Sequence, residues 1–318
     1  MRIGLTGVAG FIGSHLTERL VQLGYEVSGV DNFDPFYDRS VKERNLATIR
    51  EVAGFTLHEV DVLEEHSLVT AFEGCEKVIH LAALAGVRPS FDSMDRYTSV
   101  NVTGTARVIR AALNSGVRDL VYASSSSVYG VGADVPFKEA APLGRPASPY
   151  ATTKLAGEYL CFNSASDFRS ICALRLFTAY GPRQRPDLAV HKFARLILDG
   201  EPIPVFGDAS KTYRDYTYVG DIVEGIVASL SLEEQHEVIN LGSGSSIQLS
   251  TLIGTLEEVL GIRAKKEQLP SQRGDLEATW ADISKAERLL RYAPSRSLRD
   301  GLTDFVEWQK DSRKGTQV

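Results

Sequence analysis

The chain has 318 residues, of which 43% are hydrophobic and 24% charged, and its formal net charge is −6. This composition is typical of a soluble globular protein with one large domain or two smaller ones, and the negative balance argues against nucleic acid or an anionic membrane as a partner. No stretch approaches the roughly 18 apolar residues of a membrane span, and the three cysteines show no paired or ligand spacing, so we expect reduced thiols, no metal site and a cytoplasmic protein.

Short apolar runs alternate with helical patterns through the first half of the chain. The pattern predicts strands at residues 2–6, 26–31, 55–60, 77–82, 119–124 and 170–176 and helices at 11–23, 41–52, 94–115 and 150–167. Strands that are apolar on both faces and joined by helices predict a parallel sheet covered on both sides. The expected fold class is therefore α/β, with a doubly wound (Rossmann) sheet.

After residue 176 this alternation ends. Prolines surround a helical segment at 188–199, and a helix over 221–232 precedes a strand at 238–242 that we expect to return to the sheet. From residue 250 onward the pattern predicts helices and connectors, with 301–314 ending the fold. We predict a Rossmann domain over 1–176 with a returning segment at about 216–242, and a smaller mixed α/β substrate lobe made of 177–215 and 243–318.

The sequence TGVAGFIG joins the first predicted strand to the first helix. Gly7, Gly10 and Gly13 would let the chain turn tightly and bring backbone N–H groups to a pyrophosphate at the helix N-terminus. The second strand ends in Asp31, which can accept hydrogen bonds from a ribose and repel a 2′-phosphate, and no Lys or Arg follows before Arg39. The acid and the absence of a nearby basic residue favour NAD over NADP. The alternative interpretation of the glycine motif is a tight turn that binds no dinucleotide.

Tyr150 and Lys154 stand four residues apart and share one face of a predicted helix. A tyrosine with its ordinary pKa near 10 is a poor base at neutral pH, but an ammonium and a nicotinamide ring both favour the phenolate. Such a phenolate can take a proton from a sugar hydroxyl as hydride leaves the same carbon. Ser125 lies 25 residues upstream at a strand end. A surface pair is the alternative interpretation.

These motifs resemble the extended short-chain dehydrogenase/reductase family, and the resemblance runs nearly end to end. It includes TGVAGFIGSH, HLAALAGVR, NVTGT, YASSSSVYG, SPYATTK, LRLFTAYGPRQRPD, VFGD, RDYTYV and TWADISKAERLL. The resemblance implies that Ser125 is the active-site hydroxyl, Tyr150 the base and Lys154 its partner. The predicted cofactor-binding residues are Gly7, Gly10, Phe11, Ile12, Gly13, Asp31, Asn32, Asp61, Val62, Leu81, Ala82, Ala83, Tyr150 and Lys154.

Three further polar residues can be explained without a role in binding or catalysis. Asp61 can contact adenine or be a solvated loop acid. Asn101 matches the family's buried helix asparagine, for which we expect a packing role. His80 sits in a predicted strand, where a histidine in the core is the more common case than a proton shuttle.

Ser126 and Ser127 stand where related enzymes carry acids. Sugar 4,6-dehydratases of this family have an Asp–Glu pair after the active-site hydroxyl, and UDP-glucuronate decarboxylases have a Glu two positions after it. Serine hydroxyls can instead donate hydrogen bonds to an anion without adding charge. The closest resemblance is to epimerases of UDP-glucuronate, so we expect these serines and Thr178 to hold the sugar carboxylate and prevent decarboxylation of a 4-keto intermediate. Simple loop filling is the alternative.

The resemblance also predicts contacts at the nucleotide end. Arg185 and Arg214 suit the diphosphate because a planar guanidinium matches phosphate oxygens, and Arg88 can join them or approach the sugar. Phe206 is predicted to lie against uracil or in the core, and Asp275 to contact the uridine ribose. The role of Arg273 stays open, because Gln272 stands where many relatives have an arginine.

Together these features predict an NAD-dependent 4-epimerase that interconverts UDP-glucuronate and UDP-galacturonate as a homodimer. One alternative is a UDP-glucose/UDP-galactose 4-epimerase. A UDP-glucuronate decarboxylase would need the acid that is missing at Ser126 and Ser127, and a non-catalytic NAD-sensing protein would typically have lost Tyr150 or Lys154.

Overall fold

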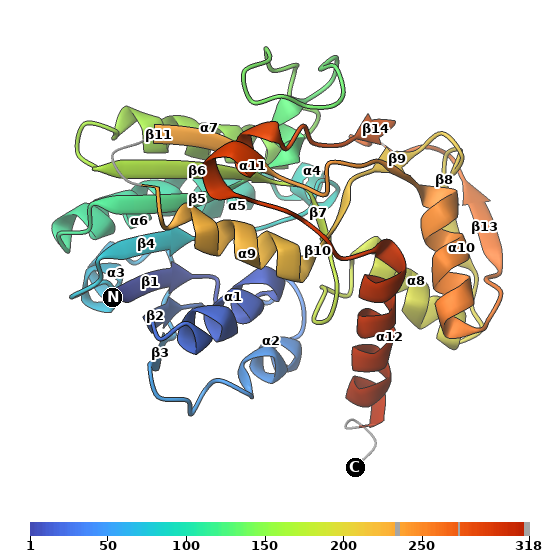
Figure 1. Cartoon of the computed structure of the whole chain (residues 1–318), viewed down its shortest axis with the longest axis horizontal. Helices are drawn as coiled ribbons and strands as arrows, with labels where there is room; N and C mark the ends of the chain where they lie inside the picture. The colour runs from blue at the N-terminus through green and yellow to red at the C-terminus, as the bar shows by residue number, and fades with distance from the viewer. Residues whose placement is uncertain (233–235, 273, 315–318) are drawn as a thin grey trace.

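The computed structural model describes residues 1–232, 236–272 and 274–314, so Arg273 lies outside the described residues. A seven-stranded parallel sheet forms its centre, with the strand order β11-β6-β5-β4-β1-β2-β3 (Figure 1). The strands are β1 (Arg2–Thr6), β2 (Glu26–Val30), β3 (Phe55–His58), β4 (Lys77–His80), β5 (Asp119–Ser125), β6 (Ser170–Leu176) and β11 (His236–Leu241). The predicted doubly wound sheet is confirmed, and the late strand returns to it beside β6.

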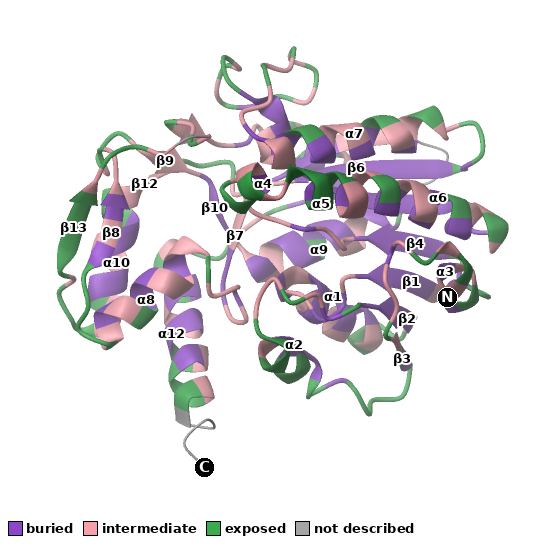
Figure 2. Ribbon diagram, turned by 180° about the vertical axis from the view of Figure 1, so that it is seen from behind, coloured by how far each residue is buried: buried purple, intermediate pink, exposed green. Residues whose placement is uncertain are grey.

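Helices cover both faces of the sheet. On one face α1 (Phe11–Gln22) packs against α9 (Val219–Ser229), and on the other α6 (Gly104–Asn114) packs against α3 (Glu65–Ala71) and α7 (Pro149–Asn163) (Figures 1 and 2). Successive residues of a strand point to opposite faces. Accordingly Val121 of β5 joins the core beside α1 and α9, whereas Leu120 and Tyr122 join the core beside α6.

Several predicted boundaries were wrong. The helix α2 runs over Arg39–Leu46, not 41–52. It starts before residue 41 because the Asp38 carboxylate caps it by accepting from the Ser40 N–H at 2.7 Å. The short helix α3 was not predicted. The segment predicted as one helix over 94–115 is divided into α5 (Met94–Thr98), a π-helical turn η1 (Ser99–Thr103) and α6.

The described residues of the C-terminal lobe form three small sheets and three helices around a separate core. Its strands are β7 (Thr178–Tyr180), β8 (Ile203–Phe206), β9 (Tyr213–Arg214), β10 (Tyr216–Tyr218), β12 (Ile247–Gln248), β13 (Lys266–Leu269) and β14 (Ala278–Thr279), and its helices are α8 (Ala189–Leu198), α10 (Leu249–Leu260) and α12 (Leu298–Lys314). The short α11 (Ser284–Leu290) packs against β11 of the central sheet. The prediction of helices and connectors alone after residue 250 was wrong, because β13 and β14 pair with strands far earlier in the chain.

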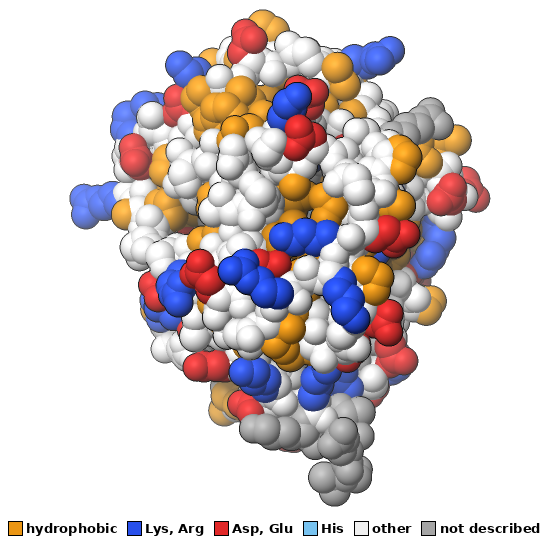
Figure 3. All heavy atoms as spheres, turned by 90° about the vertical axis from the view of Figure 1, so that its right-hand side faces the viewer, with side chains coloured by type: hydrophobic (Ala, Val, Ile, Leu, Met, Phe, Trp, Pro, Cys, Tyr) orange, Lys and Arg blue, Asp and Glu red, His pale blue; other side chains and the backbone are white. Residues whose placement is uncertain are grey.

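The surface carries charges of both signs. On the face of the C-terminal lobe drawn in Figure 3, basic and acidic side chains are interspersed. Within the described ranges, no helix is both long and apolar enough to cross a bilayer. The cysteines Cys75, Cys161 and Cys172 are buried free thiols.

Candidate active site

One cavity of about 440 Å³ lies beyond the carboxyl ends of the central strands, where ligands bind in doubly wound sheets. Most of the residues predicted from the sequence to form the site line it. These are Gly7, Gly10, Phe11, Ile12, Gly13, Asp31, Asn32, Val62, Leu81, Ala82, Ala83, Ser125, Ser126, Ser127, Tyr150, Lys154, Thr178 and Arg185. Five others, Asp61, Arg88, Phe206, Arg214 and Asp275, are not among its lining residues.

The glycine turn at the start of α1 packs its backbone so closely that a side chain at Gly7 or Gly13 would collide with neighbouring backbone atoms. Gly7 has a φ of +81°, which favours glycine, and a Cβ at Gly13 would lie 1.9 Å from the carbonyl oxygen of Gly7. The N-cap of α1 is Gly10, which supplies no side-chain cap. The first N–H groups of this helix can therefore bind an anion, as a dinucleotide pyrophosphate requires.

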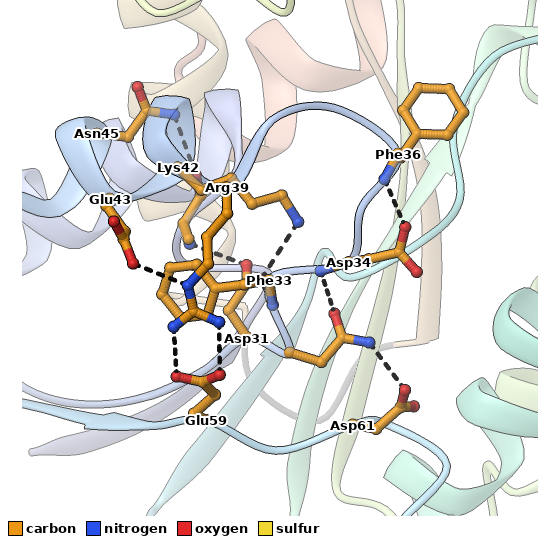
Figure 4. Close-up of polar contacts among 12 residues, drawn as sticks. Asp31, Phe33, Asp34, Phe36, Arg39, Lys42, Glu43, Asn45, Glu59 and Asp61 are labelled. Carbon is orange, nitrogen blue, oxygen red and sulfur yellow. Dashed lines mark hydrogen bonds and ion pairs between the residues drawn. The ribbon is translucent and has the colours of Figure 1, made fainter.

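Asp31 follows β2 and also lines the cavity, and Figure 4 shows its polar contacts. Its carboxylate accepts hydrogen bonds from the Ala9 N–H at 3.0 Å and the Phe33 N–H at 2.8 Å, and Lys42 Nζ lies 3.5 Å from Oδ1. Lys42 also lines the cavity and was not predicted. No motif around Lys42 indicates a role at the site, because Lys42 lies near Asp31 only when α2 packs against the end of β2.

Asn32 and Arg39, which follow Asp31 in the chain, are bound to carboxylates of other residues. Asn32 donates to the Asp61 carboxylate at 2.8 Å. The Arg39 guanidinium lies 4.4 Å over the Phe33 ring and binds Glu59 through two hydrogen bonds of 2.8 Å (Figure 4). This arginine is thus bound to a carboxylate.

Tyr150 and Lys154 lie on the first two turns of α7, which starts with Pro149 after the Ser148 side-chain cap. Burial raises the pKa of Tyr150, while the Ser125 hydroxyl and the charge of Arg185 act to lower it. Burial also lowers the pKa of Lys154 to about 8, and its ammonium lies 4.7 Å over the ring of Tyr122. The protein alone therefore leaves Tyr150 protonated at neutral pH, and a bound cationic ring would add the positive charge that favours its phenolate.

The serine run turns at the end of β5. Ser125 Oγ accepts the Ser127 N–H at 3.2 Å and caps the 3₁₀ turn η2 (Ser126–Tyr129), and its hydroxyl donates to Ser127 Oγ at 3.1 Å. Thr178 begins β7 and lines the same cavity. The hydroxyls of Ser126, Ser127 and Thr178 thus line the same cavity as Tyr150, and neither position 126 nor position 127 carries a carboxylate.

His80 and Asn101 have partners within the core. The two ring nitrogens of His80 lie 2.8 Å from Thr6 Oγ1 and 3.1 Å from Thr105 Oγ1, and burial lowers the pKa of His80 to about 3. Asn101 sits in η1, where it accepts from the Leu84 N–H at 2.8 Å and donates to Thr153 Oγ1 at 3.0 Å. These contacts tie the segment after β4 to α7, as expected for structural residues.

The predicted nucleotide-end residues form two groups. Arg185 binds Asp187 through hydrogen bonds of 3.0 and 2.8 Å and lies 5.2 Å over the Phe36 ring, another cavity residue that was not predicted. Arg88 pairs with Asp275 at 3.0 Å and lies 4.8 Å over the Phe206 ring. Arg214 donates to the carbonyl oxygens of Tyr213 and Glu277 at 2.8 and 3.2 Å.

A doubly wound sheet with this glycine turn, an acid after β2 and a Tyr–Lys pair on one helix defines an NAD-dependent enzyme of the short-chain dehydrogenase type. The chain belongs to the NAD dependent epimerase/dehydratase family, whose model matches residues 3–242. The predicted family is thereby confirmed.

Similar proteins include named sugar-nucleotide epimerases. The chain is 40% identical over 312 residues to the UDP-glucuronate 4-epimerase of Thermodesulfobacterium geofontis, covering 97% of this chain and 96% of that protein. The structure of UDP-glucuronic acid 4-epimerase from Bacillus cereus with UDP-glucuronic acid and NAD is 37% identical with a TM-score of 0.92, covering 98% and 100% of the two chains. The UDP-glucose 4-epimerase of Thermotoga maritima with UDP-glucose is 30% identical with a TM-score of 0.89, covering 98% and 100%.

Proposed function

We propose that this chain is an NAD-dependent 4-epimerase that interconverts UDP-glucuronate and UDP-galacturonate. The observation that carries the substrate assignment is the position of Ser126, Ser127 and Thr178, which line the same cavity as Tyr150 and Lys154. Neutral hydroxyls can hold a carboxylate there, whereas an acid would repel it. The identities of 40% and 37% to UDP-glucuronate 4-epimerases support the same substrate more strongly than the 30% identity to a UDP-glucose 4-epimerase.

The cavity residues divide into a cofactor half and a sugar half. Gly7, Gly10 and Gly13 would hold the pyrophosphate of NAD, and Asp31 its adenosine ribose. NAD, when bound, accepts a hydride from C4 of the sugar and returns it. Arg185 lines the cavity near Tyr150 and would bind the substrate diphosphate in place of Asp187.

Tyr150 acts as the base in this assignment. Its phenolate takes the proton of the sugar 4-hydroxyl as C4 becomes a carbonyl, and its hydroxyl returns the proton when the epimeric alcohol forms. Lys154 stabilises the phenolate, and Ser125 hydrogen-bonds the reacting oxygen. The 4-keto uronate formed between the two steps is a β-keto acid. Hydrogen bonds from Ser126, Ser127 and Thr178 would turn its carboxylate out of the alignment in which its C–C bond overlaps the carbonyl π system.

We further propose a cytoplasmic homodimer. Three buried free thiols fit a reducing compartment. Two large apolar side chains, Met94 of α5 and Tyr159 of α7, are 58% and 61% exposed on helices that pack against each other, and a second copy could cover them. Analytical sedimentation of the wild type and of Tyr159→Glu tests the dimer. We expect the wild type to sediment as a dimer and the variant as a monomer.

The deciding experiment incubates the purified protein with UDP-glucuronate and follows the products by NMR. We expect an equilibrium mixture with UDP-galacturonate, no net NADH and no UDP-pentose. Parallel incubations with UDP-glucose test the alternative. Turnover of UDP-glucose in preference to UDP-glucuronate would overturn the substrate assignment, and a pentose as the main product would indicate a decarboxylase.

A further inference from the structure

A buried ion pair lies one helical turn beyond Lys154. Glu158 of α7 and Arg175 of β6 are joined by two hydrogen bonds of 2.9 Å, and each residue is 4% exposed. Ser124 donates to the same carboxylate oxygen, Oε1 of Glu158. Neither Glu158 nor Arg175 lines the cavity, so no contact with substrate or cofactor accounts for them.

Stability is a poor explanation for this pair. Burying two opposite charges is costly, and well-packed apolar residues in their place are often equally stable or more so. Arg175 also has a buried nitrogen, Nη1, without a hydrogen-bond partner among the described residues, while its guanidinium lies 4.7 Å over the Tyr129 ring. The cost of burying the two charges therefore favours a role other than stability for the pair.

The position of Glu158 relative to Lys154 indicates that role. The two residues are four apart on α7, so their side chains share a face of the helix. The backbone around them is fixed against β5, because a Cβ at Gly157 would lie 2.0 Å from the Tyr122 hydroxyl oxygen, and that hydroxyl donates to the Lys154 carbonyl at 3.3 Å. Through Ser124, the same carboxylate also holds the residue that precedes Ser125 on β5.

Among the described residues of the elements around Lys154, Glu158 is the acidic side chain on the same face of α7. The other titratable groups near Lys154, on the described parts of α5, α7, η2, β4, β5 and β6, are Tyr97, Tyr150, Cys161, Tyr129, His80, Tyr122 and Arg175. Burial raises the pKa of all five tyrosine and cysteine side chains in this set and lowers that of His80, so these groups are neutral near pH 7. Arg175 stays charged, and because it is bonded to Glu158 it offsets part of the negative charge of that carboxylate.

The remaining elements against α7 add no charge toward Lys154. In α6, Arg107 donates to the Leu63 carbonyl and Arg110 pairs with Glu65. In α4, Asp92 is exposed, and η1 has no titratable side chain. The charge of Glu158 therefore opposes the effect of burial, which favours the neutral amine of Lys154.

We propose that Glu158 is a positioning residue, which Arg175 and Ser124 hold in place so that it keeps Lys154 charged beside Tyr150. This role rests on the proposed function in that Lys154 must be an ammonium to favour the phenolate. It predicts that the charge of Glu158, not merely its packing, sets the alkaline limit of activity.

The test is a titration of Lys154 in the full-length, NAD-loaded protein. Lysine is labelled with ¹³C at Cε, the Lys154 signal is assigned by its loss in Lys154→Met, and its shift is followed against pH. In Glu158→Gln we expect the midpoint to fall by about one pH unit, because the negative charge on the same face of α7 is lost while the positive charge of Arg175 remains. The alkaline limb of the kcat–pH profile should move down with it, while KM for the UDP-sugar stays unchanged.

A matched control lies on the same strand. Asp119, at the opposite end of β5 from Ser125, pairs with Lys77 at 2.9 Å and is also buried. Asp119→Asn should lose stability without moving the Lys154 midpoint. Glu158→Gln leaves Arg175 without its carboxylate partner and can therefore fail to fold. In that case the same titration is done on the double variant Glu158→Gln/Arg175→Met. The double variant should show a smaller shift in the same direction.

An unchanged Lys154 midpoint in either Glu158 variant overturns the proposal, and so does an equal shift in Asp119→Asn. The NMR titration needs no substrate. It therefore decides the role of Glu158 separately from the wild-type assay with UDP-glucuronate, which decides the proposed function.

Discussion

Arg88 and Asp275 form an ion pair of 3.0 Å although they are 187 residues apart in the chain. The same guanidinium lies 4.8 Å over the ring of Phe206. Burial lowers the pKa of Arg214, and the charges of Asp275 and Arg88 act on that pKa in opposite directions. Four residues predicted separately to bind the nucleotide thus lie together. This grouping is what a shared role in binding the uridine end would require.

The first prediction concerns this pair. Asp275→Ala should raise KM for UDP-glucuronate severalfold and leave kcat nearly unchanged, because the lost contacts are the same in the ground state and the transition state. Steady-state kinetics measure both constants. Asp208→Ala, which alters an exposed carboxylate paired with Lys211 on the loop after β8, is the control. A fall in kcat with unchanged KM would place Asp275 in the chemistry instead.

Tyr150→Phe removes one hydroxyl and should lower kcat by about 10²- to 10⁴-fold, the usual contribution of a general acid–base group. Binding of the UDP-sugar should change little, since the ring and its edge contact with Tyr97 are kept. Calorimetric titration and product formation measure the two effects. Tyr97→Phe, which loses a hydrogen bond to the Ala85 carbonyl, is the matched variant and should retain most activity. Full activity in Tyr150→Phe would exclude it as the base.

Lys154 couples the active site to stability. Burial lowers its pKa from 10.5 to about 8, so the charged lysine destabilises the cofactor-free protein below pH 8. Between the two pKa values the unfolded chain binds a proton that the folded protein does not, so stability rises with pH there. Lys154→Met should therefore abolish catalysis and stabilise the protein by roughly 3 kcal/mol at pH 7.

Urea unfolding at several pH values tests this effect. The advantage of Lys154→Met should shrink as pH rises from 8 toward 10.5. Lys77→Met should destabilise the protein, because Lys77 binds Asp119 and the Leu230 carbonyl, both at 2.9 Å. A Lys154→Met protein that is less stable than the wild type at pH 7 would contradict the burial cost of this ammonium.

The sequence predicted the central sheet because its strands obey a simple rule: they are apolar on both faces and separated by helices. It also predicted the cavity residues that follow strand ends, since parallel strands end at one edge. Lys42 and Glu158 escaped prediction because their importance depends on which helix face meets the sheet. The short β13 and β14 escaped because four and two residues carry too little pattern.

Asp31 and Lys42 together make a prediction about the cofactor. Asp31→Asn removes the carboxylate and frees Lys42, which lies 3.5 Å from it, to meet a 2′-phosphate. The ratio of NADP to NAD affinity should rise at least tenfold, which corresponds to about 1.4 kcal/mol. Fluorescence titrations with both cofactors measure it. Asp34→Asn, on the same loop but paired with Arg96, should leave the ratio unchanged. An unchanged ratio in Asp31→Asn would remove Asp31 from cofactor selection.

The last prediction concerns the hydroxyls of Ser127 and Thr178, which line the same cavity as Tyr150. Each hydrogen bond to a charged group contributes about 1.5–3 kcal/mol, so Ser127→Ala or Thr178→Ala should slow epimerisation of UDP-glucuronate about ten- to a hundredfold. The freed carboxylate should also rotate into alignment with the C4 carbonyl. A fraction of the intermediate would then lose carbon dioxide and leave as UDP-4-keto-pentose, with the cofactor remaining as NADH.

NMR of the products and NADH fluorescence of the same samples measure this partition. Ser125→Ala should behave differently, because its hydroxyl faces Tyr150 and acts on proton transfer, so its rate should fall without pentose. Ser231→Ala, an exposed hydroxyl bonded to the Ala228 carbonyl, should match the wild type. If Ser127→Ala and Thr178→Ala lose rate equally on UDP-glucuronate and UDP-glucose and form no pentose, the hydroxyls do not hold the carboxylate. The substrate assignment would then rest on similarity alone.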